Sequence, residues 1–409
     1  MSADDYDVAI VGASTAGCTA ARLFALGGAR VALVEKRPAL DAYKTVCTHF
    51  IQSSARPTIE KLGLAERLLE RGAIDNVIDL WTRDSGWIRN SPDAPHGFNV
   101  TRRTLDPILR GLAADTPGVE LLSGWTATGL IGEQRPTGVT VENPAHEQRS
   151  LRARLVVAAD GRDSKMALWA GVEGRERPHN RFFYWGYWRG IRPTTERSKM
   201  WILDPDCAYT FPNEDDLTVV LVGPHRDRLP EFRQDLAGSY RRMVNSLPEG
   251  PDLRGAELEG KLLGKLDLPN VMRPAAKPGL ALVGDAALAS DPLWGVGCGW
   301  AFQSADWLVQ ETGDALDDPV RLDAGLERYR RVHRRRLLPH HMMIADLSTG
   351  RPINPIERRL YRAAARDEVV RAAFERVGSR RSSPATVLDP RVLARVIAAR
   401  PRRASPVAH

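Results

Sequence analysis

Apolar and polar positions alternate at the start of this chain in a way that predicts a parallel α/β unit. Residues 6–11 form a short apolar run typical of a buried strand, and residues 18–26 form an apolar run long enough for a helix. A glycine-rich turn, 12–17, lies between them, and residues 30–34 repeat the buried-strand pattern. This order of strand, turn, helix and strand predicts a βαβ unit whose turn binds phosphate.

Later segments follow a different pattern. Strand formers are concentrated in residues 73–100 and 176–270, whereas the apolar runs 155–159 and 280–283 read as buried strands of the first unit. We therefore expect an α/β fold of two interleaved domains. The expected ranges are 1–72, 101–175 and 271–312 for a Rossmann-type domain, 73–100 and 176–270 for a mainly antiparallel substrate-binding sheet, and 313–409 for a helical C-terminal region.

The glycine-rich turn has the residues that a dinucleotide pyrophosphate requires. Gly12 and Gly17 permit close approach of the backbone, and Ser14 stands where a middle glycine is common. The pyrophosphate would rest on the N-terminus of the following helix, where unpaired N–H groups favour an anion. Glu35, at the end of the second strand, is placed to accept hydrogen bonds from an unphosphorylated ribose, as in FAD or NAD.

A second glycine-rich segment, residues 284–297, is explained by the same ligand. Gly295 and Gly297 permit the backbone to approach a flavin, and a helix that begins near Trp300 would point its positive end at the flavin N1–C2 edge. One dinucleotide bound between the two glycine-rich segments predicts a flavoenzyme.

Composition adds limits to this interpretation. The 409 residues are 43% hydrophobic, and no apolar run approaches the roughly 20 residues of a membrane span. The four cysteines have no metal-ligand or disulfide-framework spacing, so we expect no metal and a reducing, cytoplasmic location.

The net charge of +7 arises mainly from residues 351–409, with fourteen arginines and five acids. In this region Arg358-Arg359 and Arg402-Arg403 flank amphipathic stretches such as residues 360–377. Without interleaved aromatic residues, the pattern predicts a solvated helical face; nucleic-acid or membrane-surface contact is the other interpretation.

Four stretches of the chain resemble the FAD-dependent superfamily of para-hydroxybenzoate-hydroxylase-like (class A) monooxygenases, geranylgeranyl-reductase-like enzymes and flavin-dependent halogenases. They are residues 12–17, 100–106, 156–164 and 284–297. The resemblance implies a glutathione-reductase-like domain with noncovalent FAD. It places Arg102 beside the flavin, Asp160 and Gly161 between FAD and its reductant, Asp285 on the ribityl or pyrophosphate portion, and Pro292 on the face where oxygen reacts.

Two departures bring the chain closer to the reductase and halogenase branch. Class A hydroxylases usually have His where Leu288 stands and Asn where Gly299 stands. Cys47 is similar to a cysteine found after the second strand in reductase-like members, and Lys44 and His49 are candidate neighbours that would lower its pKa. An inert packed cysteine is the other interpretation of Cys47. No Trp-x-Trp-x-Ile-Pro halogenase motif is present in the sequence.

The resemblance implies that the protein uses NAD(P)H and O2 to oxygenate a hydrophobic or aromatic small molecule through a flavin C4a-hydroperoxide, plausibly in secondary metabolism. The alternatives are an FAD-dependent alkene reductase or dehydrogenase, a halogenase, and a flavin-binding electron-transfer protein without its own chemistry. NAD(P)H would visit transiently, or a separate flavin reductase would supply the electrons.

The expected site residues fall into three sets. The expected cofactor-binding residues are Gly12, Ser14, Thr15, Ala16, Gly17, Glu35, Lys36, Arg102, Asp160, Gly161, Asp285, Pro292, Gly295, Gly297 and Cys298. The expected catalytic residues are Pro292 and Cys47. The expected substrate-pocket residues are Lys44, His49, Trp188, Trp201, Tyr209 and Trp294, because an aromatic-walled pocket suits a planar or hydrophobic ligand.

Overall fold

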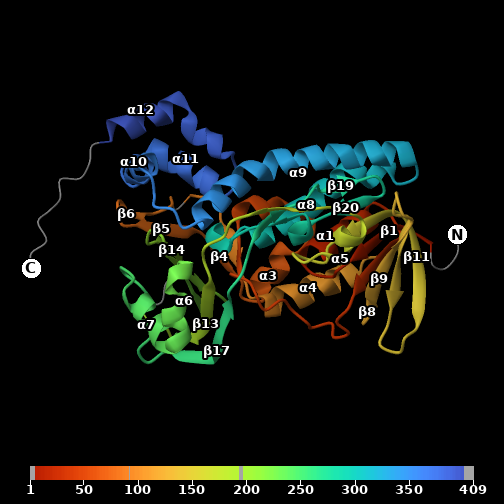
Figure 1. Ribbon diagram of the computed structural model, residues 1–409, viewed down its shortest axis with the longest axis horizontal. Coiled ribbons are helices and arrows are strands. Elements are labelled where there is room, and N and C mark those ends of the chain that lie inside the picture. Colours follow the sequence, from red (N-terminus) through yellow and green to blue (C-terminus); the bar gives the residue numbers. More distant parts are fainter. Residues whose placement is uncertain (1–4, 92, 193–196, 400–409) are drawn as a thin grey trace, which may run out of the picture.

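The structure is a computed structural model that describes residues 5–91, 93–192 and 197–399. Arg402-Arg403 and the first four residues lie outside the described ranges. Two large sheets lie side by side along the long axis of the molecule (Figure 1). The sheet near the N-terminus is the expected parallel one, and the other is mainly antiparallel. The expected α/β architecture is confirmed.

The first sheet has eight strands, of which five are parallel in the order β20-β11-β1-β2-β8. β1, β2 and β20 are buried over almost their whole length, as is typical of parallel strands covered by other elements. The antiparallel strands β9 and β10 extend β11 as a hairpin, and β19 closes the other edge. The strands are β1 (Asp5–Val11), β2 (Val31–Glu35), β8 (Val119–Ser123), β9 (Thr126–Ile131), β10 (Gly138–Glu142), β11 (Gln148–Ala158), β19 (Ala276–Lys277) and β20 (Leu280–Leu282).

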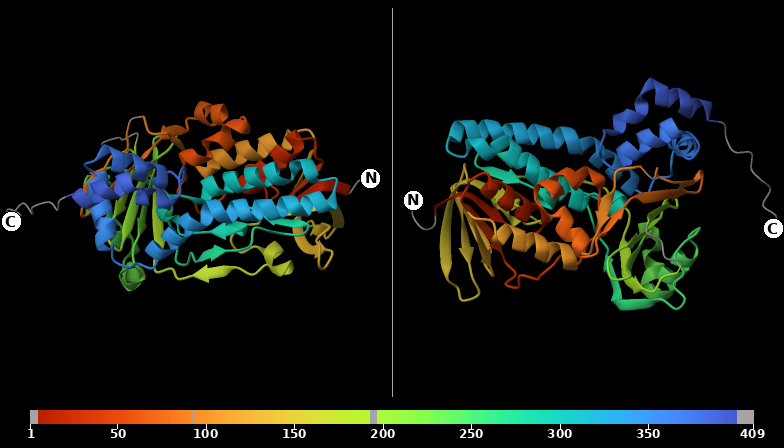
Figure 2. Two further views of the ribbon diagram at one scale, coloured as in Figure 1. Left: turned by 90° about the horizontal axis from the view of Figure 1, so that it is seen from above. Right: turned by 180° about the vertical axis from the view of Figure 1, so that it is seen from behind.

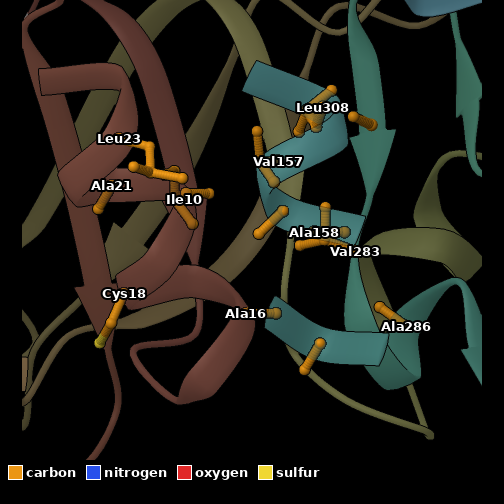
Figure 3. Packing of buried hydrophobic residues seen from close by; sticks show 14 of the residues in the cluster. Ile10, Ala16, Cys18, Ala21, Leu23, Val157, Ala158, Val283, Ala286 and Leu308 are labelled. Carbon is orange, nitrogen blue, oxygen red and sulfur yellow. The ribbon is translucent and has the colours of Figure 1, made fainter. Parts of the chain in front are cut away.

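Helices α1 and α8 pack together against this sheet (Figure 3). Small residues allow the close approach, since a side chain at Gly284 would begin 3.0 Å from the Cβ atom of Ala16. Tyr329 of α9 also reaches the sheet, donating from its hydroxyl to the Leu282 carbonyl at 2.8 Å. The helices of this part are α1 (Thr15–Leu26), α2 (Arg56–Lys61), α3 (Ala65–Glu70), α4 (Arg102–Ala114), α5 (Lys165–Trp169), α8 (Gly297–Thr312) and α9 (Pro319–Ser348).

The second sheet has seven strands and two differently covered faces. Side chains alternate between the faces, so the apolar residues of one strand belong to two separate cores. One core lies under α6 (Leu229–Gln234) and α7 (Leu236–Asn245), and the other lies toward the C-terminal helices (Figure 1). The strands are β5 (Ile78–Thr82), β6 (Gly86–Ile88), β13 (Phe183–Arg189), β14 (Ser198–Ile202), β15 (Cys207–Pro212), β16 (Leu217–Gly223) and β17 (Glu257–Lys265).

The C-terminal helices continue the long helix α9 and cover the second sheet (Figure 2). They are α10 (Pro355–Ala364), α11 (Glu368–Gly378) and α12 (Pro390–Ala398). Two three-stranded sheets connect the parts: β3 (Phe50–Ile51), β7 (Gly97–Asn99) and β4 (Ile74–Asn76), and β12 (Arg175–Arg177), β18 (Asn270–Met272) and β21 (Leu288–Ala289). No helix within the described ranges is both long and apolar enough to cross a bilayer.

Candidate functional site

Several expected cofactor residues meet at one edge of the parallel sheet. The strands β1, β2, β11 and β20 run in the same direction, so their carboxyl ends lie together. Gly12 follows β1, Glu35 ends β2, Asp160 follows β11 and Asp285 follows β20. The topology therefore gathers residues separated by up to 273 positions in sequence at a place where α/β sheets commonly bind ligands.

The turn after β1 is a tight backbone cradle. Gly12 has φ +107°, and a Cβ atom there would lie 2.4 Å from the Ala159 carbonyl oxygen. A Cβ atom at Gly17 would lie 1.8 Å from the Gly12 carbonyl oxygen. Only glycine fits at both positions. Helix α1 then begins at Thr15, whose buried hydroxyl has no partner among the described residues.

Glu35 stabilises this turn from the neighbouring strand. Its two carboxylate oxygens accept hydrogen bonds from the backbone N–H groups of Ala13 and Arg37, both at 3.0 Å. The carboxylate is buried, whereas Lys36 beside it is exposed. Glu35 therefore already has a structural role, and each of its oxygens keeps a lone pair for a ribose hydroxyl.

Arg102 connects three parts of the site although it is 3% exposed. Its guanidinium donates to the Ser14 hydroxyl at 2.7 Å, to Asp106 at 2.7 Å and to the Cys298 sulfur at 3.6 Å. The ion pair with Asp106 spans one turn of α4. Asp106 was not expected as a site residue, although its spacing of four from Arg102 in a predicted helix was a usable signal.

Asp160 and Gly161 lie beside the cradle. A Cβ atom at Gly12 would approach the Asp160 backbone nitrogen to 3.2 Å. The Asp160 carboxylate accepts from the Ser164 hydroxyl at 2.6 Å and from the Met166 N–H at 3.1 Å, which fixes the start of α5. Gly161 has φ +91° and open space around its missing side chain.

Lys44 and Asp285 form an ion pair of 2.9 Å at the same edge. Burial would raise the pKa of Asp285, but the charges of Lys44 and Arg162 outweigh it, so the pKa is lowered. The backbone N–H of Lys44 also donates to Asp106 at 2.9 Å. Gly297, the first residue of α8, lies next to Asp285, because its Cβ would be 3.9 Å from a carboxylate oxygen. Helix α8 has no side-chain cap, so its N-terminal N–H groups are available to a ligand.

Cys47 and Cys298 lie together between these groups, with 3.6 Å between their sulfur atoms. The pKa of Cys47 is well below its ordinary value, because the Cys298 thiol donates to it and the positive charge of Arg102 and the His49 N–H also stabilise a thiolate. Lys44 also interacts electrostatically with Cys47 in the direction that favours a thiolate. Cys47 is therefore not an isolated packed cysteine.

His49 contacts Tyr187, which was not expected as a site residue. The His49 Nδ1 accepts from the Arg102 backbone N–H at 2.9 Å, and Nε2 lies 2.7 Å from the Tyr187 hydroxyl. Since Nδ1 is an acceptor, a neutral ring carries its proton on Nε2 and donates to Tyr187. Burial lowers the pKa of His49, and burial raises the pKa of Tyr187 to about 12, so both side chains are neutral at pH 7.

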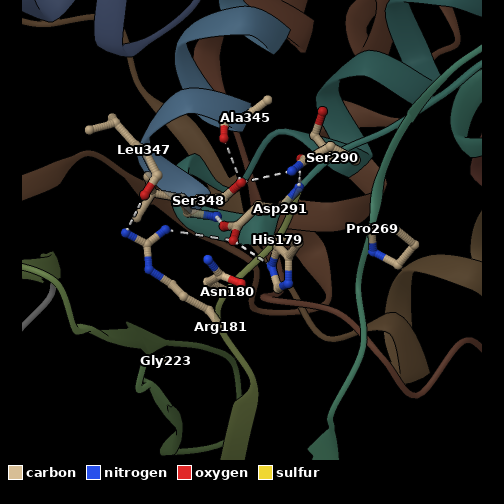
Figure 4. Close-up of polar contacts among 12 residues, drawn as sticks. His179, Asn180, Arg181, Gly223, Pro269, Ser290, Asp291, Ala345, Leu347 and Ser348 are labelled. Atoms are coloured by element: carbon tan, nitrogen blue, oxygen red, sulfur yellow. Dashed lines mark hydrogen bonds and ion pairs between the residues drawn. The ribbon is translucent and has the colours of Figure 1, made fainter. Parts of the chain in front are cut away.

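The segment 291–295 is held by a buried polar cluster (Figure 4). Asp291 is fully buried, contacts His179 at 2.8 Å and Arg181 at 3.7 Å, and accepts from the Leu293 N–H at 2.6 Å. These contacts set the short helix Pro292–Trp294, after which Gly295 takes φ +61° close to Phe50. The expected cofactor residues Pro292 and Gly295 therefore lie on a rigid turn.

The expected aromatic pocket needs a correction. Tyr209 and Trp294 belong to the core that faces the C-terminal helices. Trp188 and Trp201 lie on the opposite face, buried under α7, where their indole N–H groups bond to Tyr240 and Pro248. They form structural core and do not line the pocket. Trp185 and Tyr187 occupy the face that Trp188 was expected to occupy, because neighbouring strand residues point to opposite sides.

A pocket lies between the second sheet and helix α11. Apolar side chains line most of it, and Trp294 and Phe374 contribute from the turn 291–295 and from α11. It is narrow, about 60 Å³, so a ligand larger than a few waters would enter only with movement of these side chains. One charged side chain, Glu375, also lines it, and its carboxylate accepts from the Ser91 N–H at 2.8 Å. The other lining residues are Phe50, Gln52, Ser53, Asn76, Val77, Ile78, Leu80, Asn90, Ala94, Pro95, Gly97, Met200, Gly378 and Ser379.

A larger groove of about 690 Å³ runs along α9 among arginines. It includes Glu311 near the end of α8, about 21 Å from Gly297 by the helical rise, so it is separate from the cofactor residues. Within the described ranges, no group of three or more His, Cys, Asp or Glu residues is arranged to hold a metal ion.

These features fit FAD. The glycine cradle at Gly12, the unpartnered hydroxyl of Thr15 and the uncapped N-terminus of α8 are suited to a pyrophosphate and an electron-rich ring edge. Ser14, Ala16, Glu35 and Arg102 would contact the same ligand. When bound, FAD supplies hydride and electron transfer, while the protein supplies position and environment.

Comparison with known proteins agrees with this geometry. Residues 5–244 match the FAD binding domain family. Digeranylgeranylglycerophospholipid reductase of Thermoplasma acidophilum is 25% identical over 363 residues, covering 83% of this chain and 86% of the relative. Tryptophan 2-halogenase of Chondromyces crocatus is 26% identical over 362 residues, covering 83% of this chain and 67% of the relative.

Solved structures show the same fold. The flavin-dependent brominase Bmp2 has a TM-score of 0.79 at 15% identity, covering 97% of this chain and 100% of that chain. PqsL of Pseudomonas aeruginosa, described as a probable FAD-dependent monooxygenase, has a TM-score of 0.66 at 19% identity, covering 91% and 100%. The chain therefore belongs to the FAD binding domain family and is an FAD-dependent oxidoreductase.

Proposed function

We propose that this protein is a monooxygenase that uses NAD(P)H and O2 to oxygenate a hydrophobic or aromatic small molecule. The observation that carries the proposal is the position of Trp294. It lines an apolar pocket, and it is two residues from Pro292 on the turn that leads into α8. A ligand in this pocket would therefore adjoin the residues expected to hold the flavin.

The walls of the pocket support chemistry that must be protected from water. Leu80 and Met200 are buried on the second sheet, and Phe374 closes the opposite side. Excluding water protects a reactive oxygen species from hydrolysis and strengthens nearby electrostatic interactions. The neutral His49–Tyr187 hydrogen bond adds polar groups to this region without burying a charge.

Alkene reduction is the second candidate, and the Cys47–Cys298 pair favours it. Reduction of a double bond requires a hydride on one carbon and a proton on the other, and Cys298, whose pKa is raised, keeps a proton beside Cys47. The similarity to digeranylgeranylglycerophospholipid reductases supports the same candidate. Halogenation remains a lesser candidate because the Trp-x-Trp-x-Ile-Pro motif is missing from the sequence.

Isotope labelling separates the candidates. FAD-loaded protein would be incubated with NAD(P)H under ¹⁸O2 and a panel of aromatic, polyketide-like and prenyl compounds, and the products examined by mass spectrometry. Monooxygenation predicts one ¹⁸O atom in the product and NAD(P)H consumption that depends on oxygen. A product that gains two hydrogens under nitrogen would contradict monooxygenation and support alkene reduction. Glucose with glucose oxidase removes oxygen in a matched control.

A further inference from the structure

Arg380 occupies an unusual position next to the pocket. It follows α11 directly, is only 8% exposed and has φ +64°, a left-handed conformation that favours glycine. Its guanidinium carbon lies 5.3 Å from the centre of the Trp294 ring. Burial lowers the pKa of Arg380 to about 9, so it still carries a positive charge at pH 7.

Half of this guanidinium has no partner among the described residues. The Nη1 group donates to the carbonyl oxygens of Val377 and Gly378 at 2.6 and 2.8 Å. The Nε and Nη2 groups are buried and unpartnered. No described carboxylate forms an ion pair with Arg380, and the carbonyls at the end of α11 compensate only part of its charge.

The pocket wall beside Arg380 carries further buried polar atoms without partners. They are the Trp294 indole nitrogen, the Ser53 hydroxyl and the Gln52 amide oxygen. Gln52 connects the turn 291–295 to the end of α11, since its amide nitrogen donates to the Trp294 carbonyl at 2.6 Å and to the Gly378 carbonyl at 3.4 Å. Unpartnered buried polar atoms are uncommon, and several in one place indicate a missing ligand or water.

We propose that Arg380, which contacts the Trp294 ring beside the pocket, binds a carboxylate of the substrate when the side chains of this wall move. The free Nε and Nη2 groups are the adjacent pair that forms two parallel hydrogen bonds with a carboxylate. Trp294 provides a flat apolar surface for the part of the ligand next to that carboxylate. The inference rests on the proposed function in one respect, namely that the pocket receives the substrate. It narrows the substrate to an organic acid.

A structural role for Arg380 is the competing explanation. Arginine side chains near a helix C-terminus bond to its last carbonyls, as Nη1 does here. The end of the helix also explains the left-handed backbone, because the N–H groups of Arg380 and Arg381 donate to the carbonyls of Val377 and Arg376. Such a cap does not require burial of the Nε and Nη2 edge. Substitution separates the explanations, because a cap affects folding and a carboxylate site affects binding of acids.

The test is ligand binding to the full FAD-loaded chain, measured by calorimetry and by quenching of tryptophan fluorescence. Benzoate and benzamide are the probes because they differ in charge but little in shape. The wild type is expected to bind benzoate more tightly than benzamide. Arg380→Met is expected to weaken benzoate at least about 30-fold and benzamide less than about twofold, because a buried charge pair is lost. Arg380→Lys is expected to keep part of the preference, since it retains charge but not the paired donors.

Arg381→Met is the matched control, because Arg381 is the exposed neighbour of Arg380. Equal benzoate affinity in wild type and Arg380→Met would overturn the proposal, as would no saturable benzoate binding to the wild type at millimolar concentration. A lower melting temperature in Arg380→Met with unchanged benzoate preference would assign Arg380 as a helix cap. These outcomes are independent of ¹⁸O incorporation, so failure here is distinguishable from failure of the proposed function.

Discussion

The sulfur atoms of Cys47 and Cys298 are 3.6 Å apart, although the residues are separated by 251 positions in the sequence. Cys47 follows the first βαβ unit, and Cys298 lies in the first turn of α8. The pair joins the segment that follows β2 to the start of α8. Because one thiol can donate to the thiolate of the other, the two titrate as a unit and the first proton leaves more easily than from an isolated cysteine.

Cys47 is therefore expected to react with iodoacetamide at neutral pH faster than the other cysteines. Cys298→Ala removes the thiol donor, raises the pKa of Cys47 and slows its alkylation by up to about tenfold for each pKa unit regained at pH below that pKa. Peptide mass spectrometry after timed alkylation measures the rates. Cys18 and Cys207 serve as internal controls, since burial raises the pKa of each to about 12. Equal alkylation of all four cysteines would contradict the prediction.

Gly12→Ala is expected to abolish FAD binding. A methyl group there would lie 2.4 Å from a backbone oxygen and would require φ +107° from a residue with a side chain. The ratio of flavin to protein absorbance after purification measures binding, and thermal unfolding measures stability. Gly28→Ala is the matched control because Gly28 also has positive φ, +90°, but open space around it. We expect Gly28→Ala to bind FAD and to lose about 1–2 kcal/mol of stability. Normal FAD content in Gly12→Ala would show that the cradle does not hold the cofactor.

Asp291→Asn is expected to reduce the free energy of unfolding by about 1.5–3 kcal/mol at pH 7, since hydrogen bonds to a charged acceptor are weakened. Burial would raise the pKa of Asp291, but the His179 hydrogen bond and the Arg181 charge lower it below the ordinary 3.8. The ionised carboxylate therefore adds stability above the unfolded pKa, and this stability is lost as pH falls through the folded pKa.

Denaturant unfolding of both proteins from pH 8 to pH 3 tests this dependence. The difference between wild type and Asp291→Asn is expected to stay constant at neutral pH and to shrink below about pH 4. Asp267→Asn is the control, because Asp267 is exposed and forms only a surface ion pair with Arg226. A difference that grows as pH falls would mean that the folded structure favours the protonated form of Asp291.

Trp201→Ala and Trp294→Ala are expected to have opposite consequences. Trp201 is fully buried under α7, so its loss costs about 3–5 kcal/mol of stability but leaves benzoate binding within about twofold. Trp294 lines the pocket and stacks on Arg380, so its loss weakens benzoate. Thermal unfolding and calorimetry measure the two effects. Weaker benzoate binding in Trp201→Ala than in Trp294→Ala would place the ligand elsewhere.

Local sequence patterns were enough to predict the cofactor half of the site. The strand before Gly12, the helix that begins at Thr15 and the acid at Glu35 are close in sequence, so their spacing defines a βαβ unit. The family resemblance added Arg102 and Asp285, which lie on other elements, and the structure brings these residues to the same sheet edge. Their individual roles in binding FAD remain predictions.

The substrate half could not be predicted in the same way. The alternation along 182–188 predicts a strand with two apolar faces, but a period of two does not say which face meets α7 and which meets the pocket. Helices elsewhere in the sequence decide which face of the strand meets which core. As a result Trp188 lies in the core under α7, whereas Trp185 and Tyr187 lie on the face toward the C-terminal helices. Arg380 was part of an arginine-rich stretch that read as a solvated face, and only its contact with Trp294 distinguishes it.

The sequence by itself determined the α/β order, the phosphate-binding turn and FAD chemistry. Each of these depends on residues at short fixed spacings or on motifs that members of the family share. Tertiary structure alone decided which cysteines meet, which aromatic side chains face the ligand and where a buried arginine lies. Those contacts join residues more than 80 positions apart, and their geometry is set by how the sheets and the C-terminal helices pack.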